Sequence, residues 1–191
     1  MLKKIEKAVR RAANIMLTAE KRGTGVHAKE GVGNYVTDAD VAVQRFLQKE
    51  LHKILPEAAF VGEESGGDAF CADRPCWIVD PIDGTTNFIR SLHCSVVSAG
   101  LIEDGAPKFG VVYNPYSGEL FSAERGRGAF CNGRRIAASG RPLAKSVVSF
   151  GATVYHRDLT KRMFATLGDL FEHCEDLRQF GSAANDICQV A

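Results

Sequence analysis

The N-terminal part of the chain alternates apolar and charged positions at helical spacing. Between residues 2 and 21, apolar side chains recur every three or four positions, with lysines and arginines between them. This pattern predicts an amphipathic helix with one buried face, which ends at Gly23 and Gly25. The expected buried face contains Leu2, Ile5, Val9, Ala12, Met16 and Ala19.

The same spacing returns after a glycine-bearing loop at residues 27–34. It predicts a second helix from about Thr37 to Leu55, and Pro56 stops that helix because proline cannot continue a helical hydrogen-bond ladder. The expected buried face contains Val43, Phe46, Leu47, Leu51 and Ile54.

The rest of the chain consists mainly of short apolar runs separated by turn signals. Runs ending at Gly62 and Val79 predict two strands, and runs at 94–102, 108–115, 118–124 and 128–133 predict an antiparallel meander. Next come a strand at 146–150, an amphipathic helix at 158–173, a strand that reaches a tight turn at Gly181, and a new helix. The apolar positions of the 158–173 helix are Leu159, Met163, Leu167, Leu170 and Phe171. This order of elements describes a layered α+β protein.

Composition changes this interpretation little. The 191 residues include 24 basic and 23 acidic side chains, so a net charge of +1 favours neither nucleic acid nor an anionic membrane as a partner. No apolar run approaches the roughly 18 residues of a membrane span, and charged residues interrupt any N-terminal signal core. Six cysteines are scattered without a CxxC pair. We therefore expect a cytoplasmic protein with reduced thiols.

Chemistry first enters at residues 76–88, "CWIVDPIDGTTNF". The apolar run ends at Asp80, and Pro81 predicts that the chain leaves the sheet there. Asp83 and Gly84 follow, before residues that are typical of a helix start. Two carboxylates beside a helix start suit Mg²⁺ and a phosphate. The alternative is an acidic turn followed by an ordinary helix cap.

Two upstream segments carry further acids. Glu63 and Glu64 follow the strand that ends at Gly62, in "AAFVGEESGG". Asp40 lies in "NYVTDAD", three residues after Thr37, and this spacing is also that of a capping box. Lys29, in the preceding loop, is either a basic residue near a metal entrance or a solvated side chain.

Taken together, "VTDAD", "GEES" and "WIVDPIDGTTNF" resemble the inositol monophosphatase family of Mg²⁺-dependent, lithium-sensitive phosphatases. The resemblance spans residues 1–191 as one domain. It implies an α+β fold, the layered αβαβα sandwich of the inositol monophosphatase and fructose bisphosphatase type, incomplete at the C-terminus.

The resemblance also implies roles for individual residues. Two or three Mg²⁺ ions are expected, held by Glu63, Asp80, the Ile82 carbonyl and Asp83, with Asp80 bridging two of them. Thr85, hydrogen-bonded to Asp40, is expected to orient the attacking water together with Glu63, because a hydroxyl is too weak a base to act unaided. The expected substrate contacts are Asp83, Gly84, Thr85, Gly181, Ser182 and Ala183. The alternative for the last three is a plain helix cap.

The expected activity is hydrolysis of a phosphate monoester, with inositol monophosphate the favoured substrate and a homodimer the expected assembly. Sugar, histidinol or nucleotide phosphates are alternative substrates. A different class of function is a non-catalytic regulatory factor that contacts the transcription machinery. Neither a membrane nor direct nucleic-acid binding is expected.

The sequence also departs from the family. The family's downstream "WDxAAG" element and a substrate-selecting glutamate are not found, and the chain stops at Ala191 inside an apolar helical pattern. We expect a C-terminally truncated chain. Such a chain should turn over substrate poorly, since it lacks one ligand of the second metal.

Overall fold

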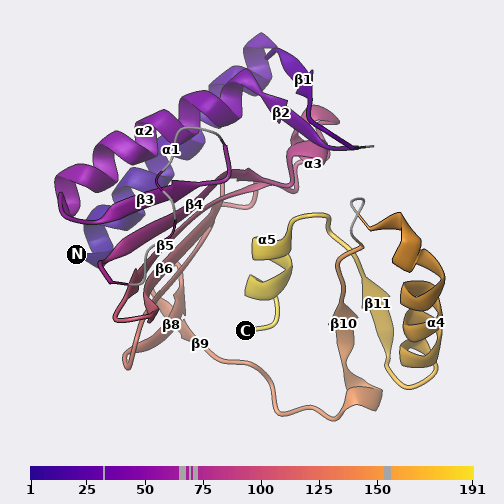
Figure 1. Cartoon of the computed structure of the whole chain (residues 1–191). Coiled ribbons are helices and arrows are strands. Elements are labelled where there is room, and N and C mark those ends of the chain that lie inside the picture. The colour runs from indigo at the N-terminus through magenta and orange to yellow at the C-terminus, as the bar shows by residue number, and fades with distance from the viewer. Residues whose placement is uncertain (32, 65–67, 69, 71–72, 153–155) are drawn as a thin grey trace.

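A seven-stranded sheet forms the centre of the protein, seen in a computed structural model that describes all residues except 32, 65–67, 69, 71–72 and 153–155 (Figure 1). The strand order is β3-β4-β5-β6-β7-β8-β9, in which β3 and β4 pair in parallel and the other described neighbours pair antiparallel. The strands are β3 (Ala59–Gly62), β4 (Cys76–Asp83), β5 (Val96–Glu103), β6 (Ala106–Asn114), β7 (Glu119–Glu124), β8 (Gly128–Cys131) and β9 (Arg134–Ile136). The predicted meander is confirmed.

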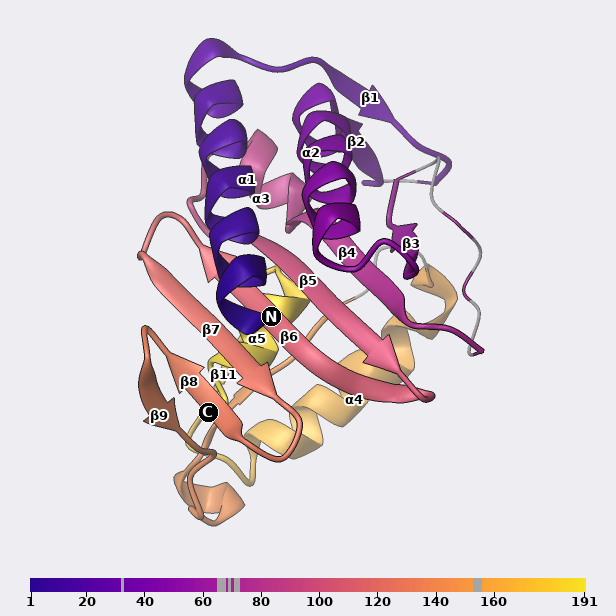
Figure 2. The ribbon, with the colours of Figure 1, turned by 90° about the vertical axis from the view of Figure 1, so that its left-hand side faces the viewer.

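Two long helices cover one face of this sheet (Figure 2). They are α1 (Leu2–Arg22) and α2 (Asp38–Ile54). Between them in the chain lies a small antiparallel pair, β1 (Val26–Ala28) and β2 (Tyr35–Thr37). The predicted apolar faces of α1 and α2 form the core with Trp77 and Val79 of β4. Each fully buried large apolar side chain stabilises the fold by roughly 1.5–3 kcal/mol. Among the helices that the structure describes, none is long and apolar enough to cross a membrane.

The other face of the sheet carries three further layers (Figure 1). Helix α5 (Ala183–Cys188) comes first, then the parallel pair β10 (Val147–Ser149) and β11 (Asp176–Arg178), then α4 (Thr160–Phe171). Short 3-10 turns at Leu143–Lys145 and Arg157–Leu159 precede β10 and α4, and α3 (Thr85–Ile89) follows β4. The layer order confirms the predicted αβαβα sandwich.

The expectation that the chain leaves the sheet at Pro81 is wrong. Strand β4 continues to Asp83 because its pairing with β5 shifts by one residue: Asp80 faces Ser98, whereas Asp83 faces Val96. The extra residue of this bulge gives Pro81 a position in the strand where the regular ladder is interrupted. The bulge therefore keeps both aspartates on the sheet.

The helix expected at 158–173 forms as α4, and none of its described side chains is buried, with Leu159 and Phe171 exposed. Amphipathic spacing predicts a helix without saying what its apolar face packs on. The short strands β1 and β9 lie where a loop and a turn were expected, since segments of three residues are too short to show periodicity.

Candidate metal and phosphate site

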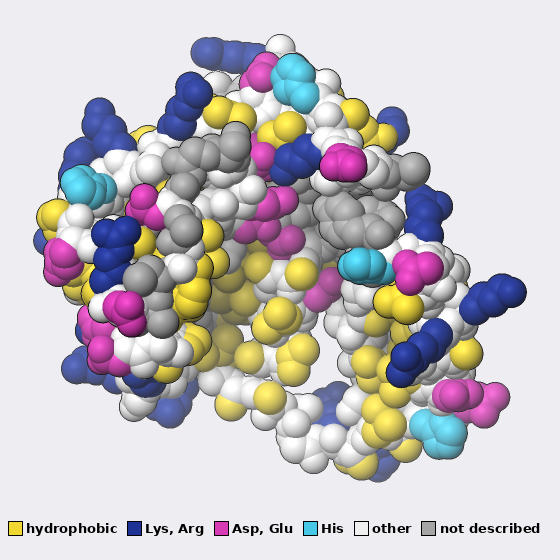
Figure 3. Space-filling model, in the orientation of Figure 1, with side chains coloured by type: hydrophobic (Ala, Val, Ile, Leu, Met, Phe, Trp, Pro, Cys, Tyr) yellow, Lys and Arg dark blue, Asp and Glu magenta, His cyan; other side chains and the backbone are white. Residues whose placement is uncertain are grey.

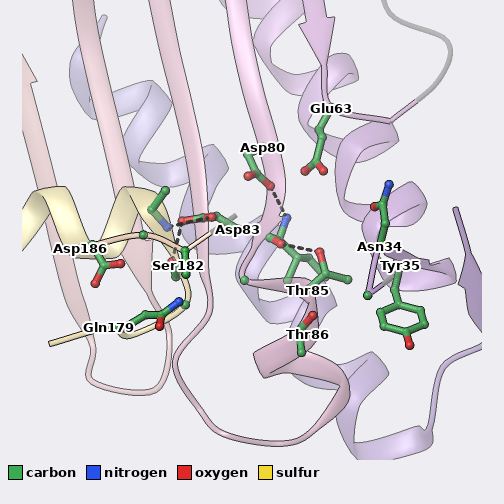
Figure 4. Close-up of a pocket in the computed structure, with 17 residues that line it drawn as sticks. Asn34, Tyr35, Glu63, Asp80, Asp83, Thr85, Thr86, Gln179, Ser182 and Asp186 are labelled. Carbon is green, nitrogen blue, oxygen red and sulfur yellow. Dashed lines mark hydrogen bonds between the residues drawn. The ribbon is translucent and has the colours of Figure 1, made fainter. Parts of the chain in front are cut away.

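The parallel pairing of β3 and β4 brings two carboxylates together. Gly62 lies opposite Val79 in this register, and the backbone amide of Glu63 donates to the Val79 carbonyl at 3.1 Å. The next residues along the two strands are Glu63 and Asp80. Their side chains lie side by side, Glu63 just beyond the end of β3 and Asp80 within β4 (Figure 4).

Asp80 has the carboxylates of Glu63 and Asp83 as close neighbours. Burial raises the pKa of Asp80 well above its ordinary value, and the charges of Glu63 and Asp83 raise it further. On the other side of Glu63, the Lys29 Nζ atom lies 3.6 Å from a Glu63 oxygen and 2.7 Å from a Glu64 oxygen. Lys29 is thus an ion-pair partner of the two glutamates, which decides against the solvated alternative.

The turn that carries the glutamates is held by Gln44 of α2. The Glu64 amide donates to Gln44 Oε1 at 2.9 Å, and Gln44 Nε2 donates to the Glu64 carbonyl at 3.0 Å. A Cβ atom on Gly62 would lie 2.1 Å from Gln44 Oε1, so only glycine leaves room for this clamp. Glu64 itself is buried. Its role here is to support the loop.

Asp83 points away from the Glu63–Asp80 pair and toward α5 (Figure 4). Its oxygens accept hydrogen bonds from Ser182 Oγ at 2.6 Å and from the amides of Ala184 at 2.7 Å and Ala183 at 3.2 Å. Ser182 is the N-cap residue of α5, but its side chain makes no capping hydrogen bond to its own helix. Ser182 therefore occupies the cap position, as the helix-cap alternative expected, while the carboxylate of Asp83 is the acceptor for the first amides of α5.

Gly84 directs the chain from β4 into α3. It has a left-handed backbone with φ 89°, which favours glycine, and a Cβ there would lie 3.1 Å from the Gly181 carbonyl. The Thr85 hydroxyl donates to the Ile82 carbonyl at 3.1 Å. The loop thereby holds the Ile82 carbonyl, a predicted metal ligand, next to the hydroxyl of Thr85, the predicted water-orienting residue.

Asp40 is buried at the start of α2, where the capping box is confirmed. Its Oδ2 atom accepts from the Thr37 amide at 2.7 Å and the Thr37 hydroxyl at 2.6 Å, while Oδ1 is buried without a hydrogen-bond partner. The expected Asp40–Thr85 hydrogen bond is absent from the described contacts, since the Thr85 hydroxyl donates to the Ile82 carbonyl instead. Burial raises the pKa of Asp40 to about 6, against the opposing effect of the Thr37 hydrogen bonds.

One pocket of about 400 Å³ lies at this site. It collects every predicted site residue except Asp40. Figure 3 shows acidic side chains gathered in the central hollow of this face. The pocket walls also include residues that sequence analysis missed, namely Asn34, Tyr35, Thr86, Gln179 and Asp186. Asp186 lies four residues after Ser182, a helical spacing that places the two on one face and would have been a usable signal.

The described lining is strongly acidic. It contains Glu63, Asp80, Asp83 and Asp186, and no lysine or arginine is among the lining residues that the structure describes. No three His, Cys, Asp or Glu side chains in the described part of the chain lie close enough to hold a metal on their own. Mg²⁺ commonly binds through one or two carboxylates and keeps several waters. The Glu63–Asp80 pair with the Ile82 carbonyl fits that manner of binding.

Fold and site together define a layered αβαβα protein with an acidic pocket at the ends of its parallel strands. The model of the inositol monophosphatase family matches residues 1–191, and the chain belongs to this family. It is 34% identical over 187 residues to the Nus factor SuhB of Pasteurella multocida, covering 97% of this chain and 70% of that protein. It is 37% identical over 163 residues to an inositol-1-monophosphatase of Mesorhizobium japonicum, covering 85% and 61%.

Solved structures show the same fold. The extragenic suppressor protein suhB of Bartonella henselae superposes with a TM-score of 0.91 at 32% identity, covering 98% of this chain and 73% of that one. An IMPase/NADP phosphatase described as complexed with Mg²⁺ and phosphate gives a TM-score of 0.80 at 25% identity, covering 94% and 67%. The chain thus spans about 70% of the length of its SuhB relatives.

Proposed function

We propose that this protein hydrolyses phosphate monoesters with Mg²⁺, and that inositol monophosphate is the substrate. The observation that carries the proposal is the charge of the pocket. Glu63 and Asp80 lie side by side within it (Figure 4), and no basic side chain is among the described residues that line it. A phosphate dianion enters such a pocket only with cations, since like charges repel at short range.

Glu63, Asp80, the Ile82 carbonyl and Asp83 would hold two or three Mg²⁺ ions. When bound, these ions neutralise the phosphoryl oxygens and lower the pKa of a water. Thr85 orients that water with Glu63, and its hydroxyl already lies 3.1 Å from the Ile82 carbonyl. Asp40 supports this part of the site from its buried position behind it. Gly84 and Thr85 offer backbone amides to the phosphate.

The pocket wall opposite Glu63 would contact the substrate's ring. Gly181, Ser182 and Ala183 lie there, and Gln179 and Asp186 add polar groups that suit a polyol. The name of the Mesorhizobium relative supports inositol monophosphate. Sugar, histidinol and nucleotide phosphates remain the alternatives. Lithium sensitivity, a homodimer and a cytoplasmic location complete the proposal.

The test is a phosphate-release assay with inositol monophosphate and the alternative esters. It uses the 191-residue chain and the same chain joined to the remaining C-terminal part of the Bartonella relative, because the chain spans only part of its relatives. We expect Mg²⁺-dependent release that EDTA stops and Asp80→Asn abolishes. Asp38→Asn, which removes an exposed acid outside the pocket, is the control. Absence of Mg²⁺-dependent release in both proteins would refute the proposal.

A second candidate function is contact with the transcription machinery, since relatives that cover 97% or more of this chain are named Nus factor SuhB. It requires no catalysis. Pull-down of RNA polymerase by the wild-type protein, retained by Asp80→Asn, would support it. Failure to retain polymerase above a bead control would exclude it.

A further inference from the structure

We infer that Asn87 is the positioning residue that sets the distance between the two halves of the pocket, and thereby the affinity for the ring of the substrate. The inference rests on the proposed function for its ligand. Asn87 lies on α3 and is 7% exposed. It is not among the residues that line the pocket, so its effect on a ligand must pass through other residues.

Asn87 joins α3 to the nearby segment before β5 and to the segment before α5, which is 93 residues away in sequence. Its Nδ2 group donates to the Cys94 carbonyl at 2.8 Å and to the Phe180 carbonyl at 2.6 Å. One amide nitrogen thus uses both of its hydrogens, one on the segment before β5 and one on the segment before α5. The second bond holds the residue next to Gly181, where the proposed ring wall begins.

The Asn87 side chain packs closely against the backbone of Gly181. A Cβ atom on Gly181 would lie 3.1 Å from Asn87 Nδ2 and 3.2 Å from Oδ1, and Gly181 has φ +76°. A Cβ on Gly84 would in turn lie 3.1 Å from the Gly181 carbonyl. Glycine at both positions lets the loop at Gly84, which would bind the phosphate, lie close to the backbone at Gly181, where the proposed ring contacts begin. The hydrogen bonds of Asn87 hold the two segments at this distance.

The ring wall has little else to hold it locally. Helix α5 has only six residues, which is too short to be stable by itself. Its described anchors at this end are Asn87, Asp83, a 3.7 Å contact from Asn185 Nδ2 to Cys94 Sγ, and the 3.4 Å bond from the Phe180 amide to Asp186. Asp83 is also a proposed metal ligand and Asp186 lines the pocket, whereas Asn87 makes the shortest of the remaining bonds and lies outside the pocket lining.

The first measurement needs no ligand. Hydrogen exchange of the wild-type chain is compared with Asn87→Ala, and with Gly181→Ala, which strains the same joint from the opposite side. We expect faster exchange in the peptide covering 180–188 and unchanged exchange in α1 and α2. Asn114→Ala is the control, because Asn114 is equally buried and accepts backbone hydrogen bonds in a turn outside the pocket. Unchanged exchange at 180–188 in both variants would overturn the inference.

The second measurement is calorimetric titration with Mg²⁺, then inorganic phosphate, then the non-hydrolysable phosphonate analogue of inositol monophosphate. Loss of two hydrogen bonds should weaken binding of the analogue by about tenfold, with Mg²⁺ and phosphate affinities within about twofold of wild type. Equal weakening of all three would show a merely structural role and overturn the inference. Failure of the wild type to bind Mg²⁺ would instead refute the proposed function, while the exchange experiment would still decide the positioning of residues 180–188.

Discussion

At the scale of single residues, the acids of the pocket determine how the site behaves. Acidic motifs located Glu63, Asp80 and Asp83 in the sequence, because carboxylates after apolar strands are visible in the chain itself. The direction of each side chain was not predictable. Asp83 turns toward Ser182, 99 residues away in sequence, and Asn87 toward Phe180, 93 residues away. Such contacts depend on the packing of α5, which no local pattern encodes.

Asp40 should make the stability of the protein depend on pH. Its pKa in the folded state is about 6, above the ordinary 3.8, so the folded protein binds this proton more tightly than the unfolded chain does. The resulting stabilisation is present below about pH 4 and is lost as the pH rises through 6. The free energy of unfolding of wild type minus that of Asp40→Asn should fall by on the order of 3 kcal/mol between pH 4 and pH 7. Urea unfolding in EDTA measures this, and a difference independent of pH would show that the folded pKa of Asp40 is not raised.

Thr85 should affect the chemical step. If its hydroxyl orients the attacking water, Thr85→Ala lowers kcat by about 10²-fold or more, with little change in KM. Thr86→Ala, on the neighbouring pocket residue, is the matched control. Steady-state kinetics are measured in the protein that is active in the phosphate-release assay. A change confined to KM would make Thr85 a binding residue.

At the scale of elements, periodicity predicted the long helices and the meander well. Both α1 and α2 have 17 or more residues, enough for the helical repeat to show. Strands β1 and β9 have three residues each and depend on neighbouring strands for their definition. The bulge at Pro81 was missed because it depends on the register with β5, which the sequence of β4 alone does not contain.

The turn after β3 depends on the clamp between Gly62 and Gln44. Gly62→Ala would place a methyl group 2.1 Å from Gln44 Oε1, so Gln44 must release the backbone of Glu64. We expect a loss of about 1–3 kcal/mol in the free energy of unfolding, and weaker Mg²⁺ binding because Glu63 moves with the turn. Gly110→Ala, in a strand position with open space around it, should change neither. Equal stability of the two variants would show that the hydrogen bonds between Gln44 and the Glu64 backbone do not depend on glycine at position 62.

At the scale of the whole molecule, the layers follow from the order of helices and strands, and the resemblance to the inositol monophosphatase family gave their arrangement. The sequence left open what the outer helix packs on. Phe164 and Phe171 of α4 and Ile187 of α5 are exposed. Amphipathic spacing identifies an apolar face without specifying what packs on it. What the layers do achieve is the convergence of β3, β4 and the start of α5 on one acidic pocket.

The central claim is that this pocket binds Mg²⁺ through Asp80, and calorimetric titration of Mg²⁺ into the wild-type chain and Asp80→Asn tests it most directly. Asp80→Asn keeps the shape of the side chain but removes the charge between Glu63 and Asp83. We predict saturable binding by the wild type and at least tenfold weaker binding by the variant, with Asp38→Asn indistinguishable from wild type. Identical isotherms for wild type and Asp80→Asn would contradict the account.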